Sequence, residues 1–311
     1  MSQDPSPNLK GEHNAVQFLA DAESIFPGHI RSSHPCRITG WDGIWLADHF
    51  MPNAEDTSVP WPEAWTTLSA IAARVPRVRL GTLVTGNTYR HPAVLAKMAA
   101  TVDHISNGRV VLGLGSGWQE NEHQQYGIEF DTVSGRLARL DEACQVIKTL
   151  FSDTKANFQG EHYQLTDASL EPKPVQSPLP LLIGGGGEKV TLKITAKYAN
   201  EWNVWGDPSI LRHKMGILDQ HCADIGRDPS EIHRTAVALL FMSDDEAYLE
   251  KMRNADIAQP KIVGTPEEVR GIVADYEAAG VGELIVPDFT MGNAEQKIAT
   301  MNRFISEVAG R

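Results

Sequence analysis

The sequence is poor in cysteine and has no long hydrophobic run. Its 311 residues include three cysteines, Cys36, Cys144 and Cys222, which are far apart and show no C-x-x-C spacing. This distribution argues against a zinc site and a disulfide framework, and it is typical of a reducing cytoplasm. No apolar stretch approaches the roughly 20 residues of a membrane-spanning helix, and the first residues show no export signal. We therefore expect a soluble, cytoplasmic, globular protein.

Positive charge is also scarce. The chain has 28 Lys and Arg residues against 40 Asp and Glu residues, which gives a formal net charge of -12. This balance predicts no nucleic-acid partner and no membrane partner, so an anionic ligand needs a local basic patch. Internal repeats, low-complexity tracts and an evident linker are lacking too, and we expect residues 1–311 to form one domain.

The most informative stretch is RVVLGLGSGWQENE, residues 109–122. Its continuous apolar run is typical of a strand covered on both faces, as in a parallel sheet. Gly115 and Gly117 remove side chains where this strand ends, and Ser116 offers a hydroxyl, so a ligand can approach the backbone. An ordinary glycine turn explains the same pattern. A dinucleotide fingerprint does not, because Glu120 stands where its third glycine should be.

Apolar runs alternate with helical patterns along most of the chain. Strands are predicted to begin at Ala15, Gly43, Val78, Arg109, Leu181, Trp202, Thr235 and Gly282. Eight alternations indicate an α/β fold of the (β/α)8 TIM-barrel type, whereas a doubly wound open sheet, the alternative, usually has fewer strands. About sixty residues follow the fourth strand, too many for a bare loop, which predicts an inserted segment with a helix and a hairpin at residues 158–163. Residues 1–40, which carry four prolines, are the least regular part.

Capping residues predict several helix boundaries. A helix is expected to open at Pro60 and Pro62, and others at His91-Pro92, Asp207-Pro208 and the capping box of Thr265. Further helices are expected from Asp21 and over residues 188–198 and 294–308.

In a barrel the active site lies at the carboxyl ends of the strands, so the residues after each apolar run form one ring. This ring comprises Asp48, His49, Thr85, Gly86, Asn87, Ser116, Gly117, Trp118, Asn121, Glu122, Gly184, Gly185, Gly186, Gly187 and Trp205. One glycine-rich end suits contact with a flat ring system, and the other can present N–H groups and a helix N-terminus to a phosphate. Lys189 and Lys193 are expected to supply the local positive charge.

His49 is the strand-end side chain best suited to proton transfer, because an unperturbed imidazole titrates near neutral pH. Asp48 is expected to orient it, although the two residues form an equally simple structural pair. Trp118 and Tyr126 are expected to wall an organic substrate, with core or loop packing as the alternative.

No metal site is predicted. Glu120, Glu122 and His123 lie close together in sequence, but their spacing is not diagnostic of metal ligands.

Five motifs carry a resemblance to a known family. They are GWDGIWLADHF, RVRLGTLVTGNTYRHPAVLAKMAATVDHISNGRVVLGLGSGWQENEHQQYGIEF, FQGEHYQL, LPLLIGGGGEK and GTPEEV. In this order they resemble the bacterial luciferase-like monooxygenase superfamily, and most of all its F420-dependent (deazaflavin) oxidoreductases. The resemblance implies a barrel that holds coenzyme F420, or alternatively FMN, at its mouth. The ring would lie near Thr85, behind it a non-proline cis peptide in the third strand, and the phosphate near residues 185–187.

The positions of the residues at the barrel mouth, taken together with the resemblance, assign roles to individual residues. His49, Asp48 and Glu122 would be catalytic, residues 85–87, 115–117 and 184–187 with Lys189 would bind the cofactor, and Trp118, Tyr126 and Trp205 would bind substrate. The sugar-phosphate dehydrogenases of the family carry a glutamate directly after the Gly-Ser/Thr-Gly turn, where this chain has Trp118. Their substrate is therefore not carried over, and Glu122 is the candidate for a partial replacement.

Three functions remain open at this point. The first is F420-dependent hydride transfer to or from a small organic substrate. The second is an FMNH2-dependent monooxygenase that uses dioxygen and a separate flavin reductase, and the third is a cofactor-binding protein without catalysis. Members of the family are often homodimers.

Overall fold

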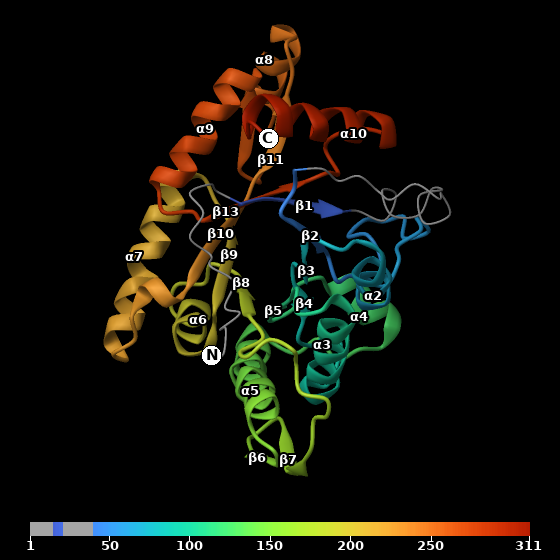
Figure 1. Cartoon of the computed structure of the whole chain (residues 1–311), viewed down its shortest axis with the longest axis vertical. Coiled ribbons are helices and arrows are strands. Elements are labelled where there is room, and N and C mark those ends of the chain that lie inside the picture. The colour runs from blue at the N-terminus through green and yellow to red at the C-terminus, as the bar shows by residue number, and fades with distance from the viewer. Residues whose placement is uncertain (1–14, 21–39) are drawn as a thin grey trace, which may run out of the picture.

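The computed structural model describes residues 15–20 and 40–311, and within them eight parallel strands form a closed ring (Figure 1). In ring order the strands are β1 (Ala15–Ala20), β2 (Gly43–Leu46), β3 (Arg79–Thr82), β5 (Val110–Gly115), β8 (Leu181–Gly184), β9 (Glu201–Trp205), β10 (His233–Val237) and β13 (Glu283–Pro287). β13 pairs back onto β1, from Ala15 opposite Glu283 to Leu19 opposite Pro287. The predicted barrel is confirmed, including its first strand, and the doubly wound alternative is wrong.

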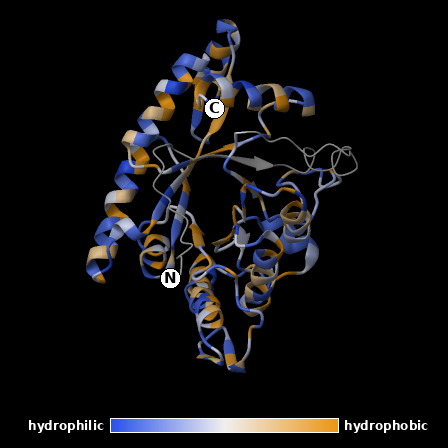
Figure 2. Ribbon diagram, in the orientation of Figure 1, coloured by the Kyte–Doolittle hydropathy of each residue, from blue (hydrophilic) through white to orange (hydrophobic). Residues whose placement is uncertain are grey.

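Most helices lie around the outside of this ring (Figure 1). They are α2 (Ala64–Arg74), α3 (Pro92–Ser106), α4 (Glu120–Tyr126), α5 (Val133–Ser152), α6 (Thr191–Tyr198), α7 (Pro208–Asp224), α8 (Glu246–Asn254), α9 (Pro266–Ala278) and α10 (Ala294–Arg303), with a 3-10 turn at Pro229–Glu231 and a π-helical turn at Phe304–Val308. Figure 2 shows hydrophobic and hydrophilic residues alternating along these helices, as amphipathic helices packed on a sheet require.

The helix caps follow the sequence closely. His91 accepts a hydrogen bond from the Ala93 N–H, Asp207 caps α7, and Thr265 forms the predicted capping box of α9. Two boundaries differ. Pro60 and Pro62 precede α2, whose N-cap is Glu63, and α6 begins at Thr191 because residues 188–190 form a turn. The helix expected from Asp21 lies outside the described residues.

The inserted segment after β5 is confirmed. It contains α4, α5 and an antiparallel hairpin of β6 (Ala156–Gln159) and β7 (Gln164–Ala168), which lies at the far end of α5 (Figure 1).

The apolar run at residues 235–241 is not one strand. β10 ends at Val237, and β11 (Leu239–Met242) leaves the ring to pair with β12 (Lys261–Gly264) in a separate two-stranded sheet. The run reads as continuous because both parts are buried, the first in the ring and the second against β12. The short strand β12 and the polar helix α8 have no strong apolar pattern, and the sequence did not predict them.

The inside of the barrel is packed rather than hollow. Trp45, Val111, Leu182, Val237 and Ile285 form its central cluster. Neighbouring positions in register on parallel strands point to the same face of the sheet. Trp205, in register with Val237 at the end of β9, therefore points into the mouth at the carboxyl ends of the strands.

Ion pairs fill the opposite end of the barrel, at the amino ends of the strands. Arg79 donates to Glu201 at 2.5 Å and to Glu283 at 2.6 Å, and both carboxylates are buried. Burial raises the pKa of Glu201 above its usual value, and the pairing with Arg79 offsets this effect only in part.

Candidate active site

The third strand breaks at a non-proline cis peptide between Leu83 and Val84, which confirms the position implied by the family resemblance. The chain then continues as β4 (Thr85–Gly86), which pairs with the end of β5. Two glycines, which have no side chain, leave room for the Val84 side chain. A Cβ on Gly115 or on Gly184 would lie 2.8 Å from a Val84 methyl group. The Val84 side chain and the backbone of Gly115 and Gly184 thus form a surface where three strands end. We call this surface the glycine floor.

Thr85 and Asn87 lie beside this floor. The Thr85 hydroxyl is used internally, since it accepts from Trp65 Nε1 at 2.9 Å and donates to Thr82 Oγ1 at 3.1 Å. Asn87 differs. Its Nδ2 donates to the Tyr163 hydroxyl at 3.2 Å, but its buried Oδ1 has no hydrogen-bond partner among the described residues. Asn87 therefore offers a ligand an acceptor, whereas Thr85 serves mainly to hold α2 against the strand.

The structure brings together His49, at the end of β2, and Glu122, on α4. His49 Nδ1 lies 2.8 Å from Glu122 Oε1. The imidazole is partly buried, and its edge meets the ring of Trp118 with centroids 5.5 Å apart. No partner for Nε2 occurs in the part of the chain that the structure describes. His49 therefore has one nitrogen fixed by a carboxylate and one available to a ligand.

Glu122 is the centre of this arrangement. Its Oε1 also accepts from the Tyr89 hydroxyl, and its Oε2 accepts from the Phe50 N–H at 2.8 Å. Burial alone would raise the pKa of Glu122, but the hydrogen bonds from His49, Phe50 and Tyr89 outweigh burial and hold it below its usual range. The carboxylate is therefore ionised at neutral pH.

The prediction that Asp48 orients His49 is wrong. The Asp48 side chain makes no hydrogen bond with His49, because both of its carboxylate oxygens are bound by Arg90. Asp48 is fully buried on the helix side, where Arg90 donates to it at 2.6 and 3.1 Å and also to Glu63, the N-cap of α2, at 2.6 Å. Burial raises the pKa of Asp48 against the opposing effect of Arg90. Asp48 thus fixes the loop that carries Arg90, and Glu122 orients the histidine.

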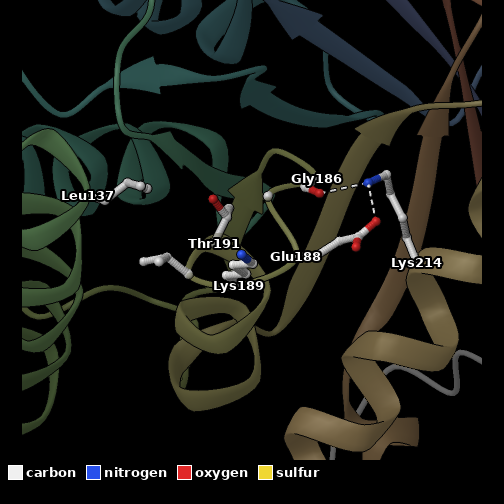
Figure 3. Close-up of a pocket in the computed structure, with 8 residues that line it drawn as sticks. Leu137, Gly186, Glu188, Lys189, Thr191 and Lys214 are labelled. Carbon is white, nitrogen blue, oxygen red and sulfur yellow. Dashed lines mark hydrogen bonds and ion pairs between the residues drawn. The ribbon is translucent and has the colours of Figure 1, made fainter. Parts of the chain in front are cut away.

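The glycine run after β8 borders an open cleft of about 430 Å³ (Figure 3). Its lining comprises Leu137, Gly186, Gly187, Glu188, Lys189, Val190, Thr191 and Lys214. A Cβ on Gly187 would lie 2.7 Å from Thr191 Oγ1, so the run must be bare to fold over the start of α6.

Lys214 holds this turn in place. It reaches from α7 and donates to the Gly186 carbonyl at 2.8 Å and to Glu188 at 3.2 Å, as the dashed lines in Figure 3 show. Lys189 lines the cleft as expected, but Lys193 points to solvent on α6 and is not part of the lining. Lysine ammonium groups and bare glycine backbone at a helix start are suited to a phosphate.

The three side chains expected to contact the substrate, Trp118, Tyr126 and Trp205, differ in their neighbours. Trp118 is 61% exposed beside His49, and Trp205 is 38% exposed at the mouth. Tyr126 is also exposed, but its ring stacks on Phe50 with centroids 5.4 Å apart. Gly117, at a φ of 82°, turns the chain between β5 and α4.

Sequence reasoning missed Tyr89 and Lys214. Both lie several residues beyond the strand ends used to define the ring, and only the way their helices and loops fold back places them at the mouth. A detectable signal existed for Tyr89, since an aromatic residue three positions after Gly86 falls on the same loop. In the described residues no cluster of three or more His, Cys, Asp or Glu side chains is arranged to hold a metal ion. Nor does any described helix combine the length and hydrophobicity needed to cross a membrane.

A closed parallel barrel with a histidine–carboxylate pair and two glycine-lined surfaces at its mouth defines the class of (β/α)8 barrels with a site at the carboxyl ends of the strands. The chain belongs to the luciferase-like monooxygenase family, whose model matches residues 39–255.

Relatives of known name support the same assignment. An F420-dependent glucose-6-phosphate dehydrogenase of Amycolatopsis mediterranei (strain U-32) is 41% identical over 187 residues, which cover 59% of this chain and 54% of that protein. This chain thus spans about half the length of that relative. A protein of the same name from Kineococcus radiotolerans is 34% identical over 257 residues, 78% of this chain and 73% of the relative.

The fold is shared with solved structures. An F420-dependent secondary alcohol dehydrogenase in complex with an F420-acetone adduct superposes with a TM-score of 0.81 at 21% identity, covering 96% of this chain and 99% of that one.

Proposed function

We propose that this protein is an F420-dependent oxidoreductase that transfers hydride between the cofactor and a small organic alcohol or carbonyl compound. The observation that carries the proposal is the His49–Glu122 pair, 2.8 Å apart, at the mouth of a barrel whose glycine floor suits a flat ring. The names of the relatives supply the cofactor class.

The residues at the mouth fit such a cofactor. The floor of Val84, Gly115 and Gly184 suits the face of a tricyclic ring, and the unpartnered Oδ1 of Asn87 suits a ring N–H. Lys189 and the turn held by Lys214 would bind the phosphate. When bound, F420 supplies a ring carbon, C5, that accepts or donates hydride.

His49 would manage the proton of the reaction. An ionised carboxylate only accepts hydrogen bonds, so Nδ1 must donate to Glu122 and the neutral ring keeps Nε2 as an acceptor. As the substrate carbon loses hydride, its hydroxyl proton passes to His49 Nε2. In the reverse direction the imidazolium returns that proton to the carbonyl oxygen.

The aromatic side chains favour an organic substrate with an apolar body. Trp118 and Trp205 present exposed rings at the mouth, and Trp118 stands where the sugar-phosphate dehydrogenases of the family carry their glutamate. We therefore propose that glucose 6-phosphate is not the substrate of this chain. We also infer a cytoplasmic enzyme, in which Cys144 and Cys222 remain buried free thiols, and a homodimer.

A cofactor titration followed by anaerobic turnover tests the proposal. Apo-protein is mixed with F420 and, separately, with FMN, and binding is followed by fluorescence. We expect tighter binding of F420 and turnover that needs no dioxygen. The second candidate is a monooxygenase that uses FMNH2 from a separate reductase, because the lysine-lined cleft suits the phosphate of either cofactor. It predicts the reverse preference and an absolute need for dioxygen. Binding without any turnover would indicate a non-catalytic cofactor-binding protein.

A further inference from the structure

Tyr89 is placed at the active site by its neighbours. A Cβ on Gly86 would lie 2.6 Å from the Tyr89 ring, so this glycine makes room for it. Phe50 and His123 pack on the ring with centroids 4.9 and 5.1 Å away. His123 is itself held by the Gln119 carbonyl at 2.6 Å and the Thr88 hydroxyl at 2.7 Å. The phenol therefore has a defined position against Glu122.

Two donors converge on one oxygen of Glu122. His49 Nδ1 lies 2.8 Å from Oε1, the Tyr89 hydroxyl donates to the same atom, and the hydroxyl oxygen is 3.3 Å from Nδ1. Burial, together with Glu122, raises the pKa of Tyr89, so the phenol keeps its proton. Because the Tyr89 hydroxyl donates to the same oxygen as His49, Glu122 interacts less strongly with the imidazole than it would alone.

We propose that Tyr89 is a positioning residue for His49: by sharing Glu122 Oε1 with the imidazole, it limits how strongly Glu122, the acceptor that keeps the neutral ring protonated at Nδ1, stabilises the imidazolium. This inference rests on the proposed function, in which His49 Nε2 is the base. It explains why a half-buried tyrosine donates to a carboxylate that already has two other donors.

Other charged groups around this unit are already paired. Asp48 and Glu63 share Arg90, and His123 packs on the Tyr89 ring and binds the Gln119 carbonyl and the Thr88 hydroxyl. Trp118 and Phe50 complete the surroundings without charge. Removing the Tyr89 hydroxyl therefore takes one hydrogen bond away from Glu122 Oε1 and breaks no ion pair.

The test is 15N NMR of histidine-labelled apo-protein, with the His49 signals assigned by their loss in His49→Gln. In the native protein the neutral ring should show the Nδ1–H pattern. Tyr89→Phe should keep this pattern and move the midpoint of the His49 titration up by about one pH unit, the tenfold change typical of a hydrogen bond to a charged group. In Glu122→Ala the Tyr89 hydroxyl is free to donate to Nδ1, so the proton should move to Nε2. The double variant Tyr89→Phe/Glu122→Ala should return to the mixture of tautomers found in water.

Tyr198→Phe is the matched control. The Tyr198 hydroxyl also lies on a carboxylate, 3.3 Å from Asp141 Oδ2, but far from the mouth. Its His49 spectrum should match that of the native protein. The proposal is overturned if Tyr89→Phe gives the same titration as Tyr198→Phe, or if Glu122→Ala retains the Nδ1–H pattern. Since no cofactor is present, these results stand apart from a failure of the apo-protein to bind F420, which would reject the proposed function instead.

Discussion

Val84 lies against Gly184, which is distant in sequence, so closely that a Cβ on the glycine would be 2.8 Å from Val84 Cγ1. The same valine packs on Gly115. Three strand ends therefore meet at one side chain, and glycine is needed on the two neighbouring strands. This contact determines the shape of the floor on which we propose the cofactor ring lies.

Gly184→Ala should displace Val84 into the mouth. We expect at least a tenfold loss of F420 affinity and a loss of about 1–3 kcal/mol in the free energy of unfolding, the usual cost of overpacking. Fluorescence titration and urea unfolding measure the two effects. Gly216→Ala on α7 is the control, because its Cβ meets nothing within 4 Å. An alanine there should be neutral or stabilising by about 0.4–1 kcal/mol. Equal affinity in both variants would show that the floor does not touch the cofactor.

Lys214→Ala should weaken binding of the phosphate-bearing cofactor by about tenfold, since it removes a positive charge worth about 1.4 kcal/mol or more and releases the Gly186 carbonyl. The effect should diminish as salt is added. Lys193→Ala is the matched control on the exposed face of α6, and it should change affinity less than twofold. If the Lys193 variant is the weaker binder, the phosphate lies elsewhere.

Much of this architecture could be predicted from the sequence. Largely apolar segments located the strands of the ring, and the rule that barrel sites lie at carboxyl strand ends brought His49 and the glycines to one mouth. The partner of His49 was harder to identify. Asp48 is its neighbour in sequence but is bound by Arg90, and Glu122, 73 residues away, reaches the histidine from α4. Such pairings depend on how loops fold back, which periodicity does not encode.

Trp118→Ala should raise the KM for an organic substrate by about tenfold and leave F420 affinity unchanged. Its exposed ring is a wall beside His49 rather than part of the glycine floor. Steady-state kinetics with a series of alcohols of increasing apolar size measures this effect. A variant that loses affinity for cofactor and keeps its KM would move Trp118 from the substrate side to the cofactor side.

Glu201→Gln should change how stability depends on pH. Because the folded state raises the pKa of Glu201 above the value of about 4.3 in the unfolded chain, the folded protein binds the proton more tightly. The contribution of this group to stability is therefore present below that value and is lost as the pH rises through the folded pKa. The change in Tm caused by the substitution should be more favourable at pH 8 than at pH 5, by about 2 °C or more. The same change in Tm at both values would show that this carboxyl has an ordinary pKa.

The most direct test of the central claim is single turnover under strict exclusion of dioxygen, with F420 bound and an alcohol added, in the native protein and in His49→Ala. The account predicts cofactor reduction in the native protein without dioxygen, and a rate at least about 100-fold lower in the variant, the usual contribution of a general base. Reduction at the same rate in His49→Ala, or oxidation of substrate only with FMNH2 and dioxygen, would contradict it.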